Sequence, residues 1–506
     1  MHPPPYYVLW LRQNKCIISH DSKNRKPKGQ DVDLVIKGGM VVTAADSYQA
    51  DLGIHNGRIT HIGPGLTGRQ TIDATGCLIF PGFVDAHVHF SLPVNGLVST
   101  DDFRTGTIAA ACGGTTTVID FITPERGQSL LEAADLRRAE ADGQAVVDYA
   151  LHVTPVDAGP RTLREVVSLA SEGYTSLKLY TTYPAVMVDD AAILHLLELA
   201  REHGIMSLVH TENHAAIEYL KSRFLAESKI EPHYHPLSRP PVVEAEAASR
   251  VIALAGLVGC PLVIAHLTCR ETLTVVERAQ QAGQPVYAEI TPNHLLLNDE
   301  LYDLPNFEGA KFVLSPPLRD RSHQSILWQA LARGTLTMVS TDHCPWTFSE
   351  QKQRGRNDFT QIPNGAPGIE TRVPLLYSEG VGKGKLALHR FVDACATAPA
   401  RLYGLFPRKG TIAVGSDADL VIFDPKREVI LSHTTLHQNV DYCPFEGWTV
   451  HGYPKTVIAR GQVVAREGKF VGPAGWGRFL KRQPFSSTEQ TAITGVIDAE
   501  TQSAHH

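Results

Sequence analysis

The chain has 506 residues, of which 43% are hydrophobic and 20% charged, an ordinary composition for a globular protein. Its 47 Lys and Arg against 53 Asp and Glu give a formal net charge of −6. This charge argues against nucleic-acid binding and against binding to anionic membranes, since both depend on clustered positive charge. No apolar run is long enough to span a membrane. The eight cysteines contain no CxxC pair and are too sparse for a secreted disulfide scaffold, so we expect a cytoplasmic protein with reduced thiols.

The first 30 residues show no pattern of a folded element. A short apolar patch at residues 6–11 precedes the basic stretch at residues 23–28, which is the reverse of the order in a signal peptide. We therefore expect a disordered extension over residues 1–30.

Short β-strands are predicted near both ends of the chain. Residues 33–43 indicate a strand, a Gly-Gly turn and a second strand. Further strands are expected at residues 50–54, 58–62, 70–73, 418–423, 454–460 and 462–466. Two β-rich segments, residues 31–80 and 406–472, thus predict one small β-sandwich domain built from both chain ends. A C-terminal tail is expected over residues 473–506.

Between these segments, residues 81–405 alternate short apolar strands with helical patterns. Apolar residues recur every three or four positions at 189–203, 243–257 and 271–281. The predicted strands are centred on residues 84–87, 117–120, 148–151, 176–179, 207–210, 262–265, 286–289 and 337–340. Such repeats predict an α/β fold, a (β/α)8 TIM barrel, whose active site lies at the carboxyl ends of the strands.

The strongest local motif is Pro-Gly-Phe-Val-Asp-Ala-His-Val-His at residues 81–89. Side chains alternate along a strand with period two, so Asp85, His87 and His89 share one face at the end of the first barrel strand. Two imidazoles on one wall can converge on one cation. A pair of buried, hydrogen-bonded histidines explains an isolated His-x-His equally well.

Residues at the ends of other predicted strands favour the metal site. The fourth strand contains Lys178 inside an apolar run, where an amine is costly unless it is neutral or paired. The fifth and sixth strands end with His210 and His266, and the eighth ends with Asp342. Imidazole and carboxylate are ordinary zinc ligands, so this collection at one rim of the barrel predicts a metal centre.

Several longer stretches carry a family resemblance. They are PGFVDAHVHF, GGTTTVIDF, LKLYTTY, AHLT, SPPLR, STDHCP, IPNGAPGIETR, PARLYGLFPRKGTIAVGSDADLVIFDP and HQNVDYCPFEGW. Over residues 33–472 the chain resembles the hydantoinase/dihydropyrimidinase family of the amidohydrolase superfamily, and D-hydantoinases in particular.

This resemblance implies a binuclear metal centre. His87 and His89 would bind the more buried of two divalent ions, and His210 and His266 would bind the second. Lys178 would be N-carboxylated, and its carbamate would bridge the two ions. Zinc is the expected metal, although nitrogen and oxygen ligands also accept manganese or cobalt.

The resemblance also implies catalytic and substrate-binding roles. Asp342 would bind the first ion and act as the catalytic acid and base. Tyr183 would hydrogen-bond the substrate carbonyl as it becomes an oxyanion, and Ser315 and Asn364 would hold the ring amide through main-chain groups. A hydroxide bridging the ions would open a hydantoin or a 5,6-dihydropyrimidine to an N-carbamoyl amino acid. Family members usually form homotetramers, and the C-terminal region often contributes to the subunit contacts.

Three loops depart from the family pattern and leave the substrate open. Residues 91–96, 180–184 and 291–294 would surround the ring substituent. An allantoinase or a cyclic imidase with the same binuclear mechanism is therefore an alternative. A dihydroorotase is less favoured, because Phe90 and Ser91 follow His89 where an arginine would hold a carboxylate. The alternative from another class is a non-catalytic scaffold related to dihydropyrimidinase, and the presence of all six candidate ligands argues against it.

Overall fold

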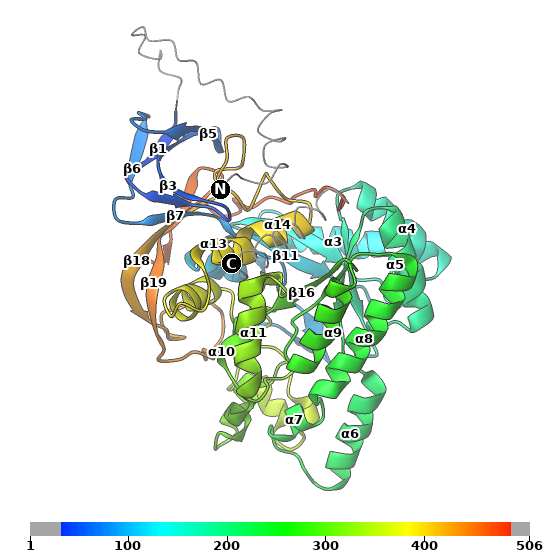
Figure 1. The fold of residues 1–506 in the computed structure, drawn as a ribbon. Coiled ribbons are helices and arrows are strands. Elements are labelled where there is room, and N and C mark those ends of the chain that lie inside the picture. The colour runs from blue at the N-terminus through cyan, green and yellow to red at the C-terminus, as the bar shows by residue number, and fades with distance from the viewer. Residues whose placement is uncertain (1–31, 487–506) are drawn as a thin grey trace, which may run out of the picture.

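A nearly closed barrel of eight parallel strands lies at the centre of the protein (Figure 1). The computed structural model describes residues 32–486, so the extension predicted over residues 1–30 lies outside the described residues. The barrel strands, which pair in chain order, are β8 (Phe83–Asp85), β11 (Thr115–Ile122), β12 (Asp148–Val153), β13 (Ser176–Tyr180), β14 (Met206–His210), β15 (Leu262–Ile264), β16 (Val286–Ile290) and β17 (Met338–Val339). The sheet edges meet where Val88 bridges His343 and where the Asp342 amide donates to the His87 carbonyl at 2.9 Å. The predicted barrel is confirmed.

Helices cover the outside of the barrel. The long ones are α2 (Phe103–Cys112), α3 (Leu130–Ala141), α4 (Pro160–Ser171), α5 (Asp190–Glu202), α8 (Pro241–Val258), α9 (Arg270–Gln281) and α11 (Ser322–Arg333). The Asp189 carboxylate caps α5 by accepting from the Ala192 amide at 2.8 Å. Helix α8 begins with Pro241 and is followed by Gly259 with a left-handed φ of 68°. The helices predicted at residues 189–203, 243–257 and 271–281 are thus confirmed.

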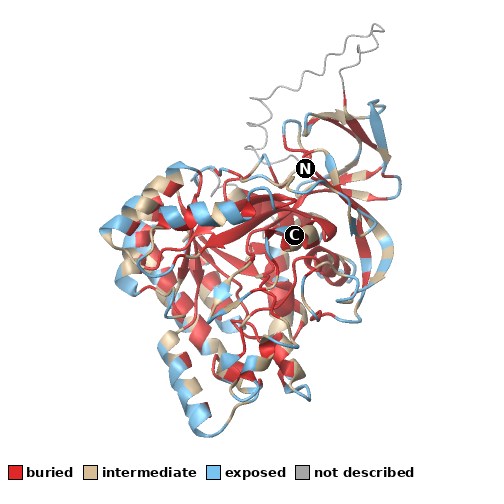
Figure 2. Ribbon diagram, turned by 180° about the vertical axis from the view of Figure 1, so that it is seen from behind, coloured by how far each residue is buried: buried red, intermediate tan, exposed pale blue. Residues whose placement is uncertain are grey.

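Short elements and the 13-residue helix α6 occupy the loops between the barrel strands and these covering helices. They are α6 (His214–Ala226), α7 (Tyr234–Leu237), α10 (Pro292–Leu296), α12 (Arg372–Leu375), α13 (Leu388–Val392), α14 (Ala398–Leu402), η1 (Asp299–Asp303), η2 (Glu308–Phe312), η3 (Lys352–Gly355), η4 (Phe359–Gln361), η5 (Leu376–Val381), η6 (Asp393–Thr397), β9 (Pro93–Val94) and β10 (Leu97–Val98). Figure 2 shows that the barrel strands are buried, while the outer helix faces reach solvent. Within residues 32–486, no helix is both long and apolar enough to cross a membrane.

Two further sheets pack beside the barrel. One has the strand order β5-β4-β1-β6 and the other the order β21-β20-β19-β18-β7-β2-β3. Their strands are β1 (Leu34–Lys37), β2 (Met40–Val42), β3 (Ser47–Gln49), β4 (Asp51–His55), β5 (Arg58–Gly63), β6 (Gln70–Asp73), β7 (Leu78–Pro81), β18 (Leu420–Ile430), β19 (Thr449–Ala459), β20 (Gln462–Arg466) and β21 (Lys469–Phe470). Side chains from both sheets share one apolar cluster, which includes Ile36, Ile54, Ile79 and Ile422. Strand β7 pairs with β18, so both chain ends build the sandwich, as the fold prediction states.

The chain after the sandwich packs against the amino-terminal end of the barrel. The Tyr149 amide donates to the Arg478 carbonyl at 3.0 Å, and the Leu480 amide donates to the Tyr149 carbonyl at 2.7 Å. The Arg482 guanidinium reaches the Ser176 hydroxyl at 2.8 Å and the Leu151 carbonyl at 2.6 Å. The described part of the predicted tail therefore closes the barrel end that faces away from the strand ends bearing the histidines.

Candidate metal centre

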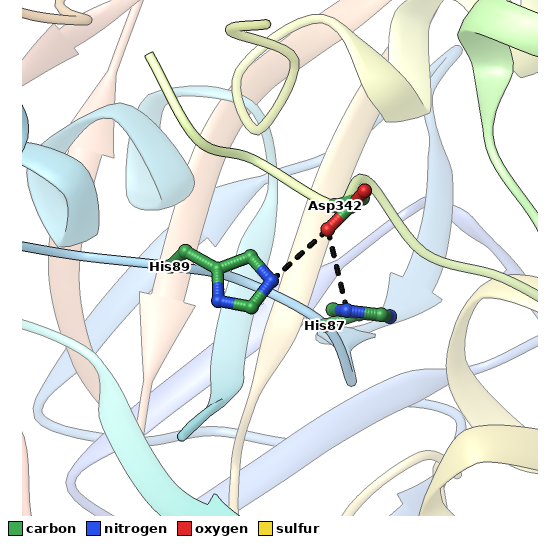
Figure 3. A group of neighbouring side chains, drawn as sticks. All are labelled: His87, His89 and Asp342. Atoms are coloured by element: carbon green, nitrogen blue, oxygen red, sulfur yellow. Dashed lines mark ion pairs between the residues drawn. The ribbon is translucent and has the colours of Figure 1, made fainter. Parts of the chain in front are cut away.

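His87, His89 and Asp342 meet at the carboxyl ends of β8 and β17 (Figure 3). Asp342 Oδ1 lies 3.2 Å from His87 Nε2 and 3.1 Å from His89 Nε2. The period of two along β8 puts both imidazoles on the same wall, as the sequence predicts. The left-handed backbone of Asp342, with a φ of 52°, is uncommon outside glycine, and such conformations concentrate at functional sites.

The surroundings of His87 favour a cation at this point. His87 Nδ1 lies 2.6 Å from Glu289 Oε1, and burial lowers the pKa of His87 well below its usual value. A neutral imidazole that donates its Nδ1 proton to this carboxylate presents only a lone pair at Nε2. That lone pair has two polar neighbours, Asp342 Oδ1 at 3.2 Å and Lys178 Nζ at 3.3 Å, and a bound cation would relieve its repulsion with the carboxylate. Two imidazoles and a carboxylate are a donor set that fits a divalent ion such as zinc.

Lys178 lies beside this group without a carboxylate partner. Its amine is buried, lies 3.3 Å from His87 Nε2 and is flanked by the rings of Phe121 and Tyr180, with centroids at 5.2 and 5.0 Å. Burial lowers the pKa of Lys178 to about 8, although Asp342 opposes the shift. No ion pair joins it to a carboxylate of residues 32–486. An amine in this position is ready to lose its proton rather than to serve as a structural cation.

His210 and His266 complete the set of predicted ligands. Their ring centroids are 4.5 Å apart, and the His266 ring lies 5.4 Å from the His87 ring. His210 Nε2 is engaged by Glu212 Oε2 at 2.7 Å, which leaves Nδ1 as its free nitrogen. His266 has a φ of 30°, and its buried Nδ1 has no hydrogen-bond partner within the part of the chain that the structure describes. The structure therefore brings all six candidate ligands to one end of the barrel.

Two buried carboxylates behind the histidines were missed by the sequence reasoning. Glu289 holds His87, and Glu212 holds His210 and also accepts from Arg239 Nη1 at 2.6 Å. Burial raises the pKa of Glu212, but Arg239 and His210 lower it to about 2. Metal-binding histidines commonly donate their second ring N–H to such a carboxylate. Two features of the sequence could have indicated these carboxylates: Glu289 interrupts an apolar strand, and Glu212 follows His210 by two residues.

The predicted substrate-binding residues lie in loops around this centre. The Tyr183 ring is 5.3 Å from the His210 ring, and the residue has a left-handed φ of 71°. Burial raises the pKa of the Tyr183 phenol, while Arg239 and Ser315 oppose the shift. Ser315 is buried beside Tyr183. The Asn364 carbonyl accepts from Trp346 Nε1 at 2.9 Å. The substrate-binding roles expected for Tyr183, Ser315 and Asn364 stay predictions.

A parallel barrel with imidazoles, a lysine and a carboxylate at its strand ends defines a metal-dependent hydrolase. Residues 78–464 match the Amidohydrolase family, and the chain belongs to this family. Its membership and the His87, His89 and Asp342 group together imply a divalent metal site.

Individual members of the family are similar to this chain over nearly its whole length. The D-hydantoinase of Ralstonia pickettii is 45% identical over 456 residues, which are 90% of this chain and 100% of the relative. The D-phenylhydantoinase of Escherichia coli is 42% identical over 89% of this chain and 98% of the relative. The crystal structure of dihydropyrimidinase from Brevibacillus agri has a TM-score of 0.88 and 46% identity, with 89% of this chain and 99% of that chain covered. The predicted family resemblance is confirmed.

Proposed function

We propose that this protein is a metal-dependent cyclic amidohydrolase that opens the ring amide of hydantoins or 5,6-dihydropyrimidines to N-carbamoyl amino acids. The observation that carries the proposal is that His87 Nε2 lies 3.2 Å from Asp342 Oδ1 and 3.3 Å from the Lys178 amine, which has no carboxylate partner among residues 32–486. Near full-length similarity to enzymes named D-hydantoinase and dihydropyrimidinase supports the choice of substrate class.

The proposal includes two zinc ions and an N-carboxylated Lys178. The buried amine has no carboxylate partner, and carboxylation would turn it into an anion between the two pairs of histidines. His87, His89 and Asp342 would hold one ion, and His210 and His266 the other. Bound divalent ions would supply Lewis acidity and lower the pKa of water from about 15.7 toward 7, so that a hydroxide is available at neutral pH.

Asp342 is suited to move the proton during ring opening. Its Oδ1 lies 3.2 and 3.1 Å from the two imidazoles, and the Asp342 side chain is 15% exposed. From this position the carboxylate can take the proton of the attacking water and pass it to the ring nitrogen as the amide C–N bond breaks. One water is consumed, and the products are a carboxylate and a carbamoyl group on the same molecule.

Tyr183 is suited to stabilise the oxyanion. Because burial raises the pKa of its phenol, the hydroxyl keeps its proton at neutral pH and can donate to the carbonyl oxygen as negative charge develops. Ser315 and Asn364 would bind the ring amide through their main-chain groups. On the resemblance alone, the proposal also includes a cytoplasmic homotetramer, for which light scattering would give four times the chain mass of 55.3 kDa.

A substrate panel with metal analysis tests this proposal. The purified protein, reconstituted with zinc, is assayed on hydantoin, 5-substituted hydantoins, dihydrouracil, allantoin and succinimide. We expect about two zinc ions per chain and formation of N-carbamoylglycine from hydantoin, both lost on chelation and regained with zinc. Opening of allantoin or succinimide alone would reassign the substrate. A chain that binds no metal and opens none of the rings would contradict the proposal.

A further inference from the structure

Lys352 is a second buried lysine near the centre, and the proposed mechanism does not use it. It begins the short helix η3 and is fully buried. Its Nζ lies 2.8 Å from the Val313 carbonyl, 3.0 Å from the Pro363 carbonyl and 2.8 Å from the Gly365 carbonyl. Buried ammonium groups are usually paired with a carboxylate. Here the three N–H bonds of one ammonium meet three main-chain oxygens instead, which is the full donor capacity of the group.

The three carbonyls belong to the two segments that carry the predicted amide-binding residues. Val313 lies two residues before Ser315, while Pro363 and Gly365 flank Asn364 on both sides. The two segments also touch directly, because the Gly365 amide donates to the Val313 carbonyl at 3.0 Å. The Lys352 ammonium therefore links the Ser315 segment to the Asn364 segment next to this main-chain hydrogen bond.

The Asn364 segment also packs closely on the chain that follows Asp342. Gly365 has a φ of 134°, and a Cβ at this position would lie 2.4 Å from the Cys344 carbonyl oxygen. The Cys344 amide donates to the Ala366 carbonyl at 3.1 Å. The Asn364 segment, which Lys352 binds, is therefore in direct contact with the chain that carries Asp342.

We propose that Lys352 is a positioning residue whose ammonium sets the spacing between the Ser315 and Asn364 main-chain groups and thereby the affinity for the ring amide. This inference rests on the proposed function. Without the ammonium, the buried Pro363 and Gly365 carbonyls lose the donor that Lys352 supplies, and only the hydrogen bond from the Gly365 amide to the Val313 carbonyl still joins the two segments, so their spacing is less firmly fixed. The hydrogen bonds of the Lys352 ammonium go to main-chain carbonyls and not to the six candidate metal ligands, so its loss changes substrate binding and leaves the metal content intact.

Lys352→Met and Lys352→Gln, assayed as zinc-loaded full-length protein on hydantoin, test the inference. We expect Lys352→Met to raise KM at least about tenfold and to change kcat less than about threefold, which is the pattern for lost uniform binding. Lys352→Gln keeps two of the three donors, so its KM should lie between those of the wild type and Lys352→Met. If Lys352→Met does not fold, the KM of Lys352→Gln tests the inference.

The matched control is Lys409→Met. Lys409 is equally buried, but its ammonium pairs with Asp148 and Asp419 at 2.6 Å each, far from the amide-binding segments. This variant should melt at a lower temperature with an unchanged KM, which separates positioning from general stability.

Each outcome then has a distinct meaning. A wild-type KM in folded Lys352→Gln and Lys352→Met, or a loss of zinc in either, overturns the role of Lys352. A rise in KM that Lys409→Met shares equally also overturns it. Failure of the wild-type enzyme to open any cyclic amide contradicts the proposed function instead, so the two failures remain distinguishable.

Discussion

Two buried lysines, one at each end of the barrel, have opposite surroundings. Lys178 lies among histidines at the carboxyl ends of the strands, and burial lowers its pKa to about 8. Lys409 lies between the barrel and the sandwich, 2.6 Å from both Asp148 and Asp419. Burial alone would lower the pKa of Lys409, but the two carboxylates raise it above its usual value. The same type of side chain thus holds its proton more tightly than usual at one end and less tightly at the other.

The two ends of the barrel differ in how their buried polar groups are paired. At the Lys409 end, Lys409 and its carboxylates neutralise each other within the protein, as buried charges require, although Arg482 Nε there also has no partner among the described residues. At the Lys178 end, several buried side-chain atoms have no partner among the described residues. They include His89 Nδ1, His266 Nδ1 and Glu212 Oε1. Buried polar atoms without partners cost free energy, so they indicate that ligands from outside the chain complete this end.

Lys178→Ala should have the largest effect on activity. If the carbamate bridges two ions, this variant loses bound metal, and ring opening falls by at least on the order of a thousandfold. The barrel should still fold, because the change removes a buried amine that has no carboxylate partner. Metal analysis, hydantoin turnover and circular dichroism melting provide the three readouts. Lys178→Arg is the matched control: it keeps the charge, cannot form the carbamate and should be equally inactive. Wild-type turnover in either variant would refute the bridging role.

Asp342→Asn should be the next most damaging change. The amide has nearly the shape of the carboxylate but cannot accept and return a proton, so kcat should fall by about 10²- to 10⁴-fold. KM should change little, because Asp342 faces the imidazoles through Oδ1 rather than binding the ring. Steady-state kinetics on hydantoin measure both constants. A loss confined to KM would show that the carboxylate is not the proton shuttle.

Glu289→Gln should have an intermediate effect through His87. The neutral amide holds the His87 Nδ1 proton more weakly than a carboxylate does, so zinc affinity should fall by about ten- to a hundredfold. Glu212→Gln is the matched change behind His210, on the side of the second ion. Competition with a calibrated chelator separates the two sites. Unchanged zinc affinity in both variants would rule out a role of these carboxylates in holding the metal ligands.

The barrel and its ligand-type residues were predictable because both depend on local periodicity. Strand burial and the period of two put His87 and His89 on one wall, and barrel topology puts all strand ends at one rim. These two rules need no knowledge of long-range contacts. They are sufficient for the fold class, and they select the residues whose roles the experiments above will test.

The supporting charges were not predictable, because their surroundings come from distant parts of the chain. Glu289 meets His87 across 202 positions of sequence, and Lys409 meets Asp148 across 261. Lys352 stands in the polar run Gln351-Lys352-Gln353-Arg354, where a sequence reading expects a solvent-exposed lysine. Only the folded loops show that this ammonium is buried among three carbonyls.

Lys409→Met tests the amino-terminal end of the barrel and should leave catalysis unchanged. The substitution leaves Asp148 and Asp419 with Arg460 as their remaining charged neighbour, since Arg460 Nε lies 3.0 Å from Asp148 and its amide donates to Asp419 at 2.7 Å. Leaving buried carboxylates without their partner should cost about 3–5 kcal/mol of unfolding free energy. Urea unfolding measures this loss, while kcat, KM and zinc content, determined well below the melting temperature, should equal those of the wild type. A drop in kcat without a drop in stability would mean that the two ends of the barrel are coupled, and the division into a neutralised end and a ligand-dependent end would be wrong.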